Sequence, residues 1–129
     1  MSRFSPLLKE LKQLQAGLNA TVNRIWSIKL ATAAAYQHGH EPGAFLPRRL
    51  HLREQEEQLK FERMIHRLNR LISSQFDSTL IAFSSADDVK TVARISRTIR
   101  YIHNSFSGEP PLGFTLAKIN SALPAYSRN

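Results

Sequence analysis

The sequence contains no cysteine, which excludes a disulfide framework, a thiolate nucleophile and a Cys-based zinc or iron–sulfur site. With only 5 Gly and 6 Pro, it is neither collagen-like nor of low complexity. Its least charged apolar stretch, residues 25–36, is interrupted by Lys29 and is shorter than the roughly 20 residues of a membrane span. The N-terminus becomes charged at Lys9 and Glu10, unlike a secretory signal. We therefore expect a cytoplasmic protein with no membrane partner.

Acidic residues are also scarce. The chain has 10 Asp and Glu against 18 Lys and Arg, a formal net charge of +8, and a pI near 10.5. Its hydrophobic content of 42% is enough for a core, and 129 residues is an ordinary length for one domain. No repeat or Gly/Ser-rich linker divides the chain. The sequence therefore predicts a single helical domain over residues 1–129.

The N-terminal third has the pattern of a long helix. Ser5 and Pro6 form a typical start signal, and the helix is expected to end near Gln37, before a Gly- and Pro-containing loop. Apolar residues then follow at heptad-like spacing, with Thr21 at the one vacant position: Leu7, Leu11, Leu14, Leu18, Ile25 and Ile28. Such a seam predicts packing against another long helix, either within the chain or from a second subunit.

Three further segments are also helical in pattern. The second is expected from about residue 50 to residue 73 or beyond, and residues 76–83 are left open between helix and strand. The third begins with a capping box at Ser85 and Asp88, and a short one covers about residues 114–123. Their apolar positions recur with helical period: Phe61, Ile65, Leu68 and Ile72, then Val89, Val92, Ile95, Ile99, Ile102 and Phe106. The predicted fold is all-α, a bundle of about four helices with two or three long amphipathic ones.

Basic residues gather on the faces of the second and third helices that lie away from these apolar positions. Guanidinium groups bind phosphate oxygens with two hydrogen bonds, and phosphate neutralisation releases counterions. We therefore predict binding to nucleic acid, DNA or RNA, with low sequence specificity. The candidate contacts are Arg49, Arg53, Lys60, Arg63, Arg67, Arg70, Lys90, Arg94, Arg97, Arg100 and Tyr101.

Two other interpretations remain open. The basic faces can be ordinary solvated surfaces, because Glu54, Glu57 and Glu62 are placed to pair within the helix. Alternatively, the chain is a protein-interaction module, such as an adaptor or an inhibitor of a nucleic-acid enzyme. In that case it would associate with a protein partner or a second copy through Leu7, Leu11, Leu14, Leu18 and Ile25. Trp26 is expected in the core under either interpretation.

Signals of catalysis are weak. The chain has neither a Gly-x-Ser-x-Gly nucleophile elbow nor a Gly-rich phosphate loop. His38, His40 and His51 lack the spacing of a known metal site. We expect no enzymatic activity, cofactor or metal. Residues 58–65 resemble a short helical stretch in primosome replication-restart accessory proteins, but the rest of the chain offers no match, and no residue role follows from it.

Overall fold

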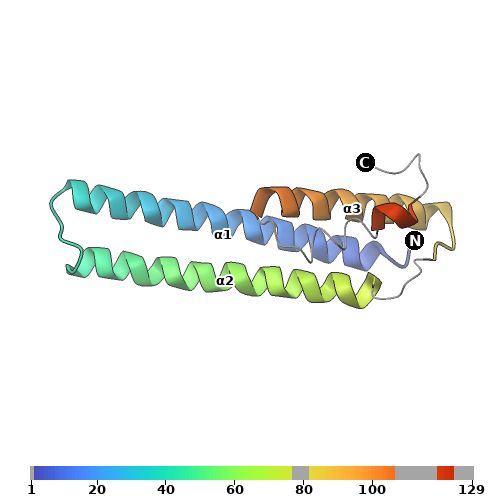
Figure 1. Ribbon diagram of the computed structural model, residues 1–129, viewed down its shortest axis with the longest axis horizontal. Coiled ribbons are helices and arrows are strands. Elements are labelled where there is room, and N and C mark those ends of the chain that lie inside the picture. The colour runs from blue at the N-terminus through green and yellow to red at the C-terminus, as the bar shows by residue number, and fades with distance from the viewer. Residues whose placement is uncertain (1, 77–81, 107–118, 124–129) are drawn as a thin grey trace. The chain divides into compact units, whose positions relative to one another are not determined.

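The computed structural model describes residues 2–76, 82–106 and 119–123, and these residues are helical with short connections. The helices are α1 (Ser5–Gln37), α2 (Phe45–Phe76) and α3 (Ala86–Phe106) (Figure 1). A short helical segment covers residues 119–122. The all-α prediction is confirmed, and three of the expected helices are present. Residues 77–81 and 114–118, on which two of the predictions fall, lie outside the described residues.

Helix boundaries agree with the sequence signals except at the start of α2. α1 begins at Ser5 and ends at Gln37 as predicted. Its end is closed by Gly39, whose φ of 90° suits glycine. The amides of Gly39 and His40 donate to the carbonyls of Tyr36 and Ala35 at 3.0 and 3.1 Å, as in a Schellman motif. α2 begins at Phe45 instead of near residue 50, because Pro47 is tolerated in the first helical turn, where an amide has no intrahelical partner.

Contacts divide the chain into two compact units, each described by itself. One unit comprises Met1–Gln15 and Arg67–Asn129, and we call it the α3 unit. The other, Ala16–His66, contains the rest of α1 and α2, and we call it the hairpin. Within the described residues, no helix is long and apolar enough to cross a membrane.

The α3 unit has a well-packed core. Phe4, directly before α1, stacks on Phe76, the last residue of α2, with ring centroids 5.8 Å apart. α3 starts beside the beginning of α1 and runs in the same direction (Figure 1). The most deeply buried apolar side chains of this unit, each at most 2% exposed, are Leu11, Leu68, Ile72, Phe76, Val92, Ile95, Ile99, Ile102, Ile119 and Leu123.

The start of α3 is fixed by a buried carboxylate. The Asp88 amide donates to Ser85 Oγ at 3.2 Å, which confirms Ser85 as the N-cap and one half of the predicted capping box. In place of the other half, the Asp88 carboxylate accepts a hydrogen bond from the amide of Ser84. Asp88 itself is only 2% exposed. Its carboxylate accepts hydrogen bonds from Ser2 Oγ at 2.5 Å, Ser84 Oγ at 2.7 Å and the Ser84 amide at 2.9 Å. The same side chain therefore holds the helix start and ties it to the N-terminal residues.

The hairpin has a much thinner core. Its segments of α1 and α2 lie antiparallel and are joined by the loop over residues 38–44 (Figure 1). The heptad seam of α1 continues here through Leu18, Thr21, Ile28 and Ala35, all buried. On α2, however, no residue from 51 to 66 is buried, although all of them are described. The buried side chains of the hairpin therefore belong mainly to α1.

Trp26 corrects a sequence expectation. It lies one position after the seam and is 60% exposed instead of lying in the core. Its ring is covered in part by Lys29, whose Nζ is 5.5 Å from the ring centroid. The cation–π contact leaves most of the indole accessible on the surface of the hairpin.

Candidate nucleic-acid interface

α3 presents one narrow exposed strip. Nine of its residues are buried, and the exposed residues that lie between them, Lys90, Arg94, Arg97 and Tyr101, follow one line. At the two ends of α3, Ala86, Asp87, Asn104 and Ser105 are exposed as well. At about 1.5 Å rise per residue, successive members lie about 4.5 to 6 Å apart along the helix axis. We call these four residues the α3 strip. The nine buried residues are Asp88, Thr91, Val92, Ala93, Ile95, Ser96, Thr98, Ile99 and Ile102.

The α3 strip retains its positive charge. In the part of the chain that the structure describes, the ion pairs join Glu57 to Arg24 and Lys60, and none includes a cation of the strip. The one buried carboxylate of α3, Asp88, is directed to Ser2 and Ser84. These cations are therefore available to an external anion. Arg100, also expected to contact nucleic acid, is half-buried beside the strip.

Tyr101 ends the strip with an aromatic ring. It is 44% exposed, and it meets Phe106 edge-on with centroids 6.4 Å apart and an interplanar angle of 79°. This contact supports the ring on one side. A supported but accessible ring next to cations is a suitable surface for stacking of a base.

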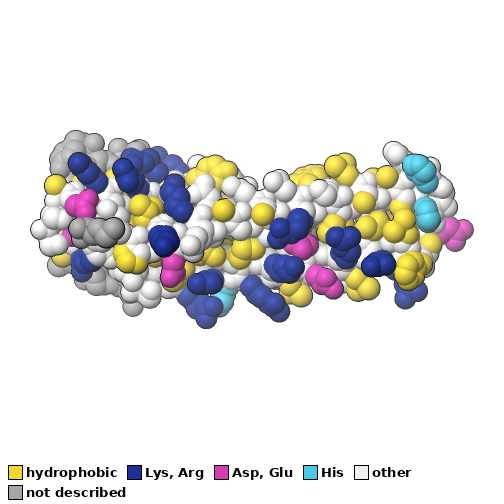
Figure 2. All heavy atoms as spheres, turned by 180° about the vertical axis from the view of Figure 1, so that it is seen from behind, with side chains coloured by type: hydrophobic (Ala, Val, Ile, Leu, Met, Phe, Trp, Pro, Cys, Tyr) yellow, Lys and Arg dark blue, Asp and Glu magenta, His cyan; other side chains and the backbone are white. Residues whose placement is uncertain are grey.

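The expected contacts on α2 are all exposed but are divided between the two units. Arg67 and Arg70 belong to the α3 unit. The other four, which belong to the hairpin, are Arg49, Arg53, Lys60 and Arg63. Figure 2 shows basic side chains gathered in groups on one face of the molecule, with apolar side chains between them. α2 is one unbroken helix, and all six of these cations are exposed along it.

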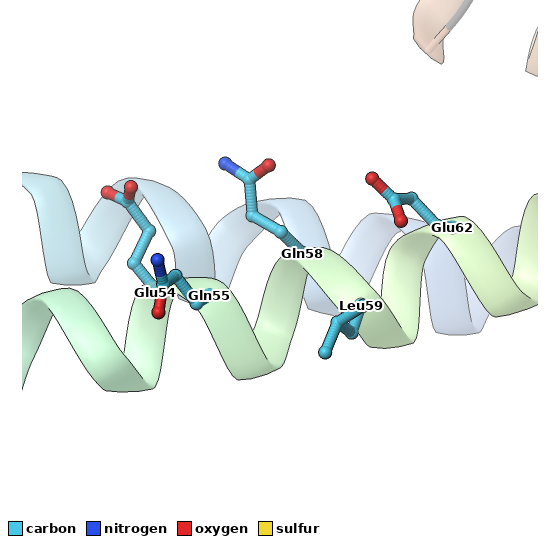
Figure 3. A pocket seen from close by; sticks show the side chains of 5 residues that line it. All are labelled: Glu54, Gln55, Gln58, Leu59 and Glu62. Carbon is cyan, nitrogen blue, oxygen red and sulfur yellow. The ribbon is translucent and has the colours of Figure 1, made fainter.

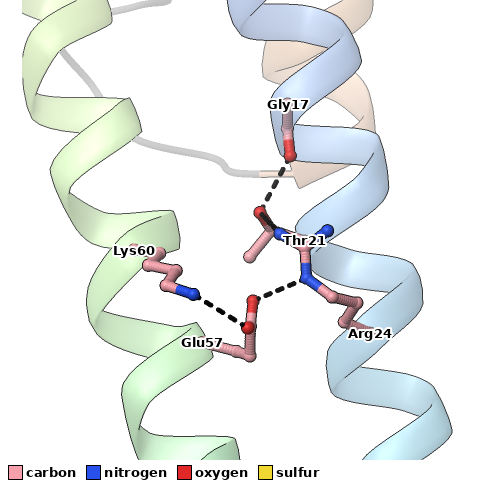
Figure 4. Close-up of polar contacts among 5 residues, drawn as sticks. All are labelled: Gly17, Thr21, Arg24, Glu57 and Lys60. Atoms are coloured by element: carbon pink, nitrogen blue, oxygen red, sulfur yellow. Dashed lines mark hydrogen bonds and ion pairs between the residues drawn. The ribbon is translucent and has the colours of Figure 1, made fainter.

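In the hairpin, an acidic side chain compensates part of the positive charge (Figure 4). The Glu57 carboxylate accepts hydrogen bonds from Arg24 Nε at 2.9 Å and from Lys60 Nζ at 3.2 Å. The Arg24 hydrogen bond is the main reason why the pKa of Glu57 is lowered. Arg24 Nη2 also donates to Thr21 Oγ1 at 3.0 Å, and Thr21 Oγ1 donates to the Gly17 carbonyl at 2.8 Å. The Glu57–Lys60 pair is of the intrahelical kind expected from the sequence, whereas Arg24 was not anticipated.

The leucine seam expected for the alternative function lies inside the chain. Leu7, Leu11, Leu14 and Leu18 are buried, at most 8% exposed, and Ile25 is half-buried. A partner would have to displace the chain's own core to reach them. The candidate metal-binding histidines are exposed, and His38 Nδ1 lies 2.8 Å from the carbonyl of Ala34. No group of three or more potential ligands occurs among the described residues.

Comparisons with protein-family models, curated proteins and solved structures found no match for this chain.

Proposed function

We propose that this chain is a small basic accessory protein that binds nucleic acid with low sequence specificity, chiefly through the α3 strip. The supporting observation is that three cations lie exposed on a helix of which nine residues are buried, and that none of the three belongs to an ion pair among the described residues. Two of the three are Arg, which can form paired hydrogen bonds to phosphate.

Low specificity follows from how α3 is held. Bases are read in the grooves of a duplex, usually by a helix that enters the major groove. α3 offers only the narrow strip, because nine of its residues are used in packing. Contacts from such a strip go mainly to the backbone, where phosphates carry no sequence information. The strip therefore fits an accessory role better than that of a sequence-specific regulator.

The test compares two variants that lose the same charge. The strip variant carries Lys90→Gln, Arg94→Gln and Arg97→Gln. The control variant carries three Arg→Gln changes on the hairpin. Binding to labelled single-stranded and duplex oligonucleotides is measured by fluorescence anisotropy over a range of salt concentrations. Each phosphate contact contributes about 0.7 to 0.9 to the steepness of the plot of log K against log salt concentration. The slope for the strip variant should therefore be less steep by roughly 2 to 3. The control changes are Arg49→Gln, Arg53→Gln and Arg63→Gln.

Two results would contradict the proposal. In one, the unaltered chain binds with an affinity that does not change with salt. In the other, the two triple variants lose affinity equally, which would leave no special role for the α3 strip. Circular dichroism at 222 nm establishes that both variants keep their helices.

A further inference from the structure

The exposed apolar residues are concentrated in the hairpin. Of the eight large apolar side chains that are exposed among the described residues, seven belong to the hairpin, and the eighth is Tyr101. Contiguous apolar surface on a small protein usually marks a site of interaction. The seven are Trp26, Leu30, Tyr36, Phe45, Leu46, Leu52 and Leu59.

Five of the seven keep heptad spacing, and Leu30 and Leu46 lie outside the pattern. On α2, Phe45, Leu52 and Leu59 are seven residues apart and so lie on one line. On α1, each residue of a second stripe comes one position after a seam residue. The stripe consists of Val22, Trp26, Lys29, Ala33 and Tyr36, which are alternately four and three residues apart. A helix with two heptad stripes is suited to contact two other helices. Each stripe therefore calls for a long helical partner.

The hairpin also needs more burial than it has. Its seam includes the buried Thr21 and the half-buried Glu57, both polar, and residues 51–66 include no buried side chain. Most helical stability in proteins comes from tertiary packing of an apolar face. Two-helix hairpins achieve this packing when two of them combine into a four-helix bundle.

The hairpin's own surface is complementary to itself. On α2, a shallow hollow of about 420 Å³ is lined by Glu54, Gln55, Gln58, Leu59 and Glu62. Figure 3 shows the side chains of Glu54, Gln58 and Glu62 projecting from the same side of α2. The hollow thus combines two carboxylates, two amides and one apolar residue. It suits an occupant that presents an aromatic ring beside a cation.

α1 of the same hairpin presents such an occupant. Trp26 is 60% exposed, and the Lys29 ammonium lies over its ring. In an antiparallel pair, residues that follow the seam by one position on either helix face the same side. Because Arg24 contacts Glu57, Trp26 lies level with Gln55. A two-fold axis parallel to the hairpin would therefore place α1 of one copy over α2 of the other. Trp26 of the first copy would then lie level with the hollow of the second, and its Lys29 would lie within one helical turn of Glu54 of the second.

We propose that the hairpin is a self-association surface on which two copies of this chain form a four-helix bundle. Trp26 of each copy enters the hollow lined by Gln55, Gln58 and Leu59 of the other, and Lys29 faces the carboxylate of Glu54. The proposal does not depend on the nucleic-acid function, because it uses hairpin residues alone.

The experiment measures mass and fluorescence of the full chain over a range of concentrations. The unaltered protein should reach twice 14.7 kDa by light scattering. Because the chain has one tryptophan, its emission should shift to the blue over the same concentration range. Trp26→Ser should give a monomer, whereas Tyr101→Ser, which removes an exposed aromatic ring from the other unit, should leave the mass unchanged.

A charge exchange keeps the test decisive if Trp26→Ser does not fold. Lys29→Glu alone should weaken association at least tenfold, and Lys29→Glu combined with Glu54→Lys should restore it. A mass of one chain at every concentration would overturn the proposal. A dimer whose tryptophan emission stays typical of a water-exposed indole would also overturn it. So would a dimer whose mass is unaffected by Trp26→Ser, because in both cases the two copies would meet through another surface.

Discussion

Replacing Asp88 with Asn should remove a pH-dependent part of the protein's stability. Asp88 is buried and accepts three hydrogen bonds from Ser2 and Ser84. The hydrogen bond from Ser2, followed by those from Ser84, lowers the pKa of this carboxyl from 3.8 to about 2. An Asn side chain keeps the size but has only one acceptor oxygen and no charge, so the link between the N-terminus and α3 should be weakened.

The direction of the change in stability, and the pH range in which it occurs, follow from the lowered pKa of Asp88. A carboxyl whose pKa is depressed by folding stabilises the folded state fully above its ordinary pKa, and this stabilisation is lost as the pH falls toward the folded value. For Asp88 this places the loss between about pH 4 and pH 2. The fall of the pKa from 3.8 to about 2 fixes the direction of the effect and the pH range over which it is lost. Asp88→Asn should therefore lower stability at neutral pH and flatten its dependence on acid.

Urea denaturation followed by circular dichroism at several pH values from 2 to 7 measures both effects. Asp87→Asn is the matched control, because Asp87 is exposed on the same helical turn and shares the favourable position near the positive end of the helix dipole. Its acid profile should resemble that of the unaltered protein. If Asp88→Asn kept the full loss of stability between pH 4 and pH 2, the assignment of that loss to Asp88 would be wrong.

Two predictions concern packing, and both are measured by urea denaturation. Ile99→Ala should lower the free energy of unfolding by about 2 to 5 kcal/mol, because Ile99 is 0% exposed; a loss below about 1 kcal/mol would show that the site is not a packed core. Gly17→Ala should change stability little, because a gain of about 1 kcal/mol in helix propensity is opposed by a 3.0 Å approach of the new Cβ to Met64 Sδ. In a Met64→Ala background the gain should emerge, and its absence there would contradict this explanation.

Sequence patterns predicted the helices and their buried faces because these depend on local order. The 4-3 alternation of leucines placed Leu7, Leu11, Leu14 and Leu18 in the core. On α3 the same reasoning found Val92, Ile95, Ile99 and Ile102, all 0% exposed, whereas Val89 and Phe106, at the two ends of that face, are half-buried. Periodicity is reliable where one face of a helix is covered along its whole length.

The candidate sites were harder to predict because they depend on contacts that are distant in sequence. Asp88 was recognised as part of a cap, but no local pattern indicates Ser2, 86 residues away, as its partner. Arg24 likewise meets Glu57 across the hairpin, 33 residues away. Trp26 is a large hydrophobic residue one position from the seam, so its type and position predicted that it lies in the core. The structure instead shows Trp26 60% exposed on the surface of the hairpin.

The two proposals are carried by different units, and this separation gives a combined prediction. A dimer formed through the hairpins has two α3 strips, and linked binding sites raise the affinity for a ligand that spans both. Trp26→Ser should therefore weaken binding to long nucleic acids by about tenfold or more and leave binding to short oligonucleotides unchanged. The triple change at Lys90, Arg94 and Arg97 should weaken binding at both lengths but leave the dimer intact. An equal loss by Trp26→Ser at both lengths would mean that Trp26 contacts the nucleic acid itself, and the hairpin would then belong to the binding surface.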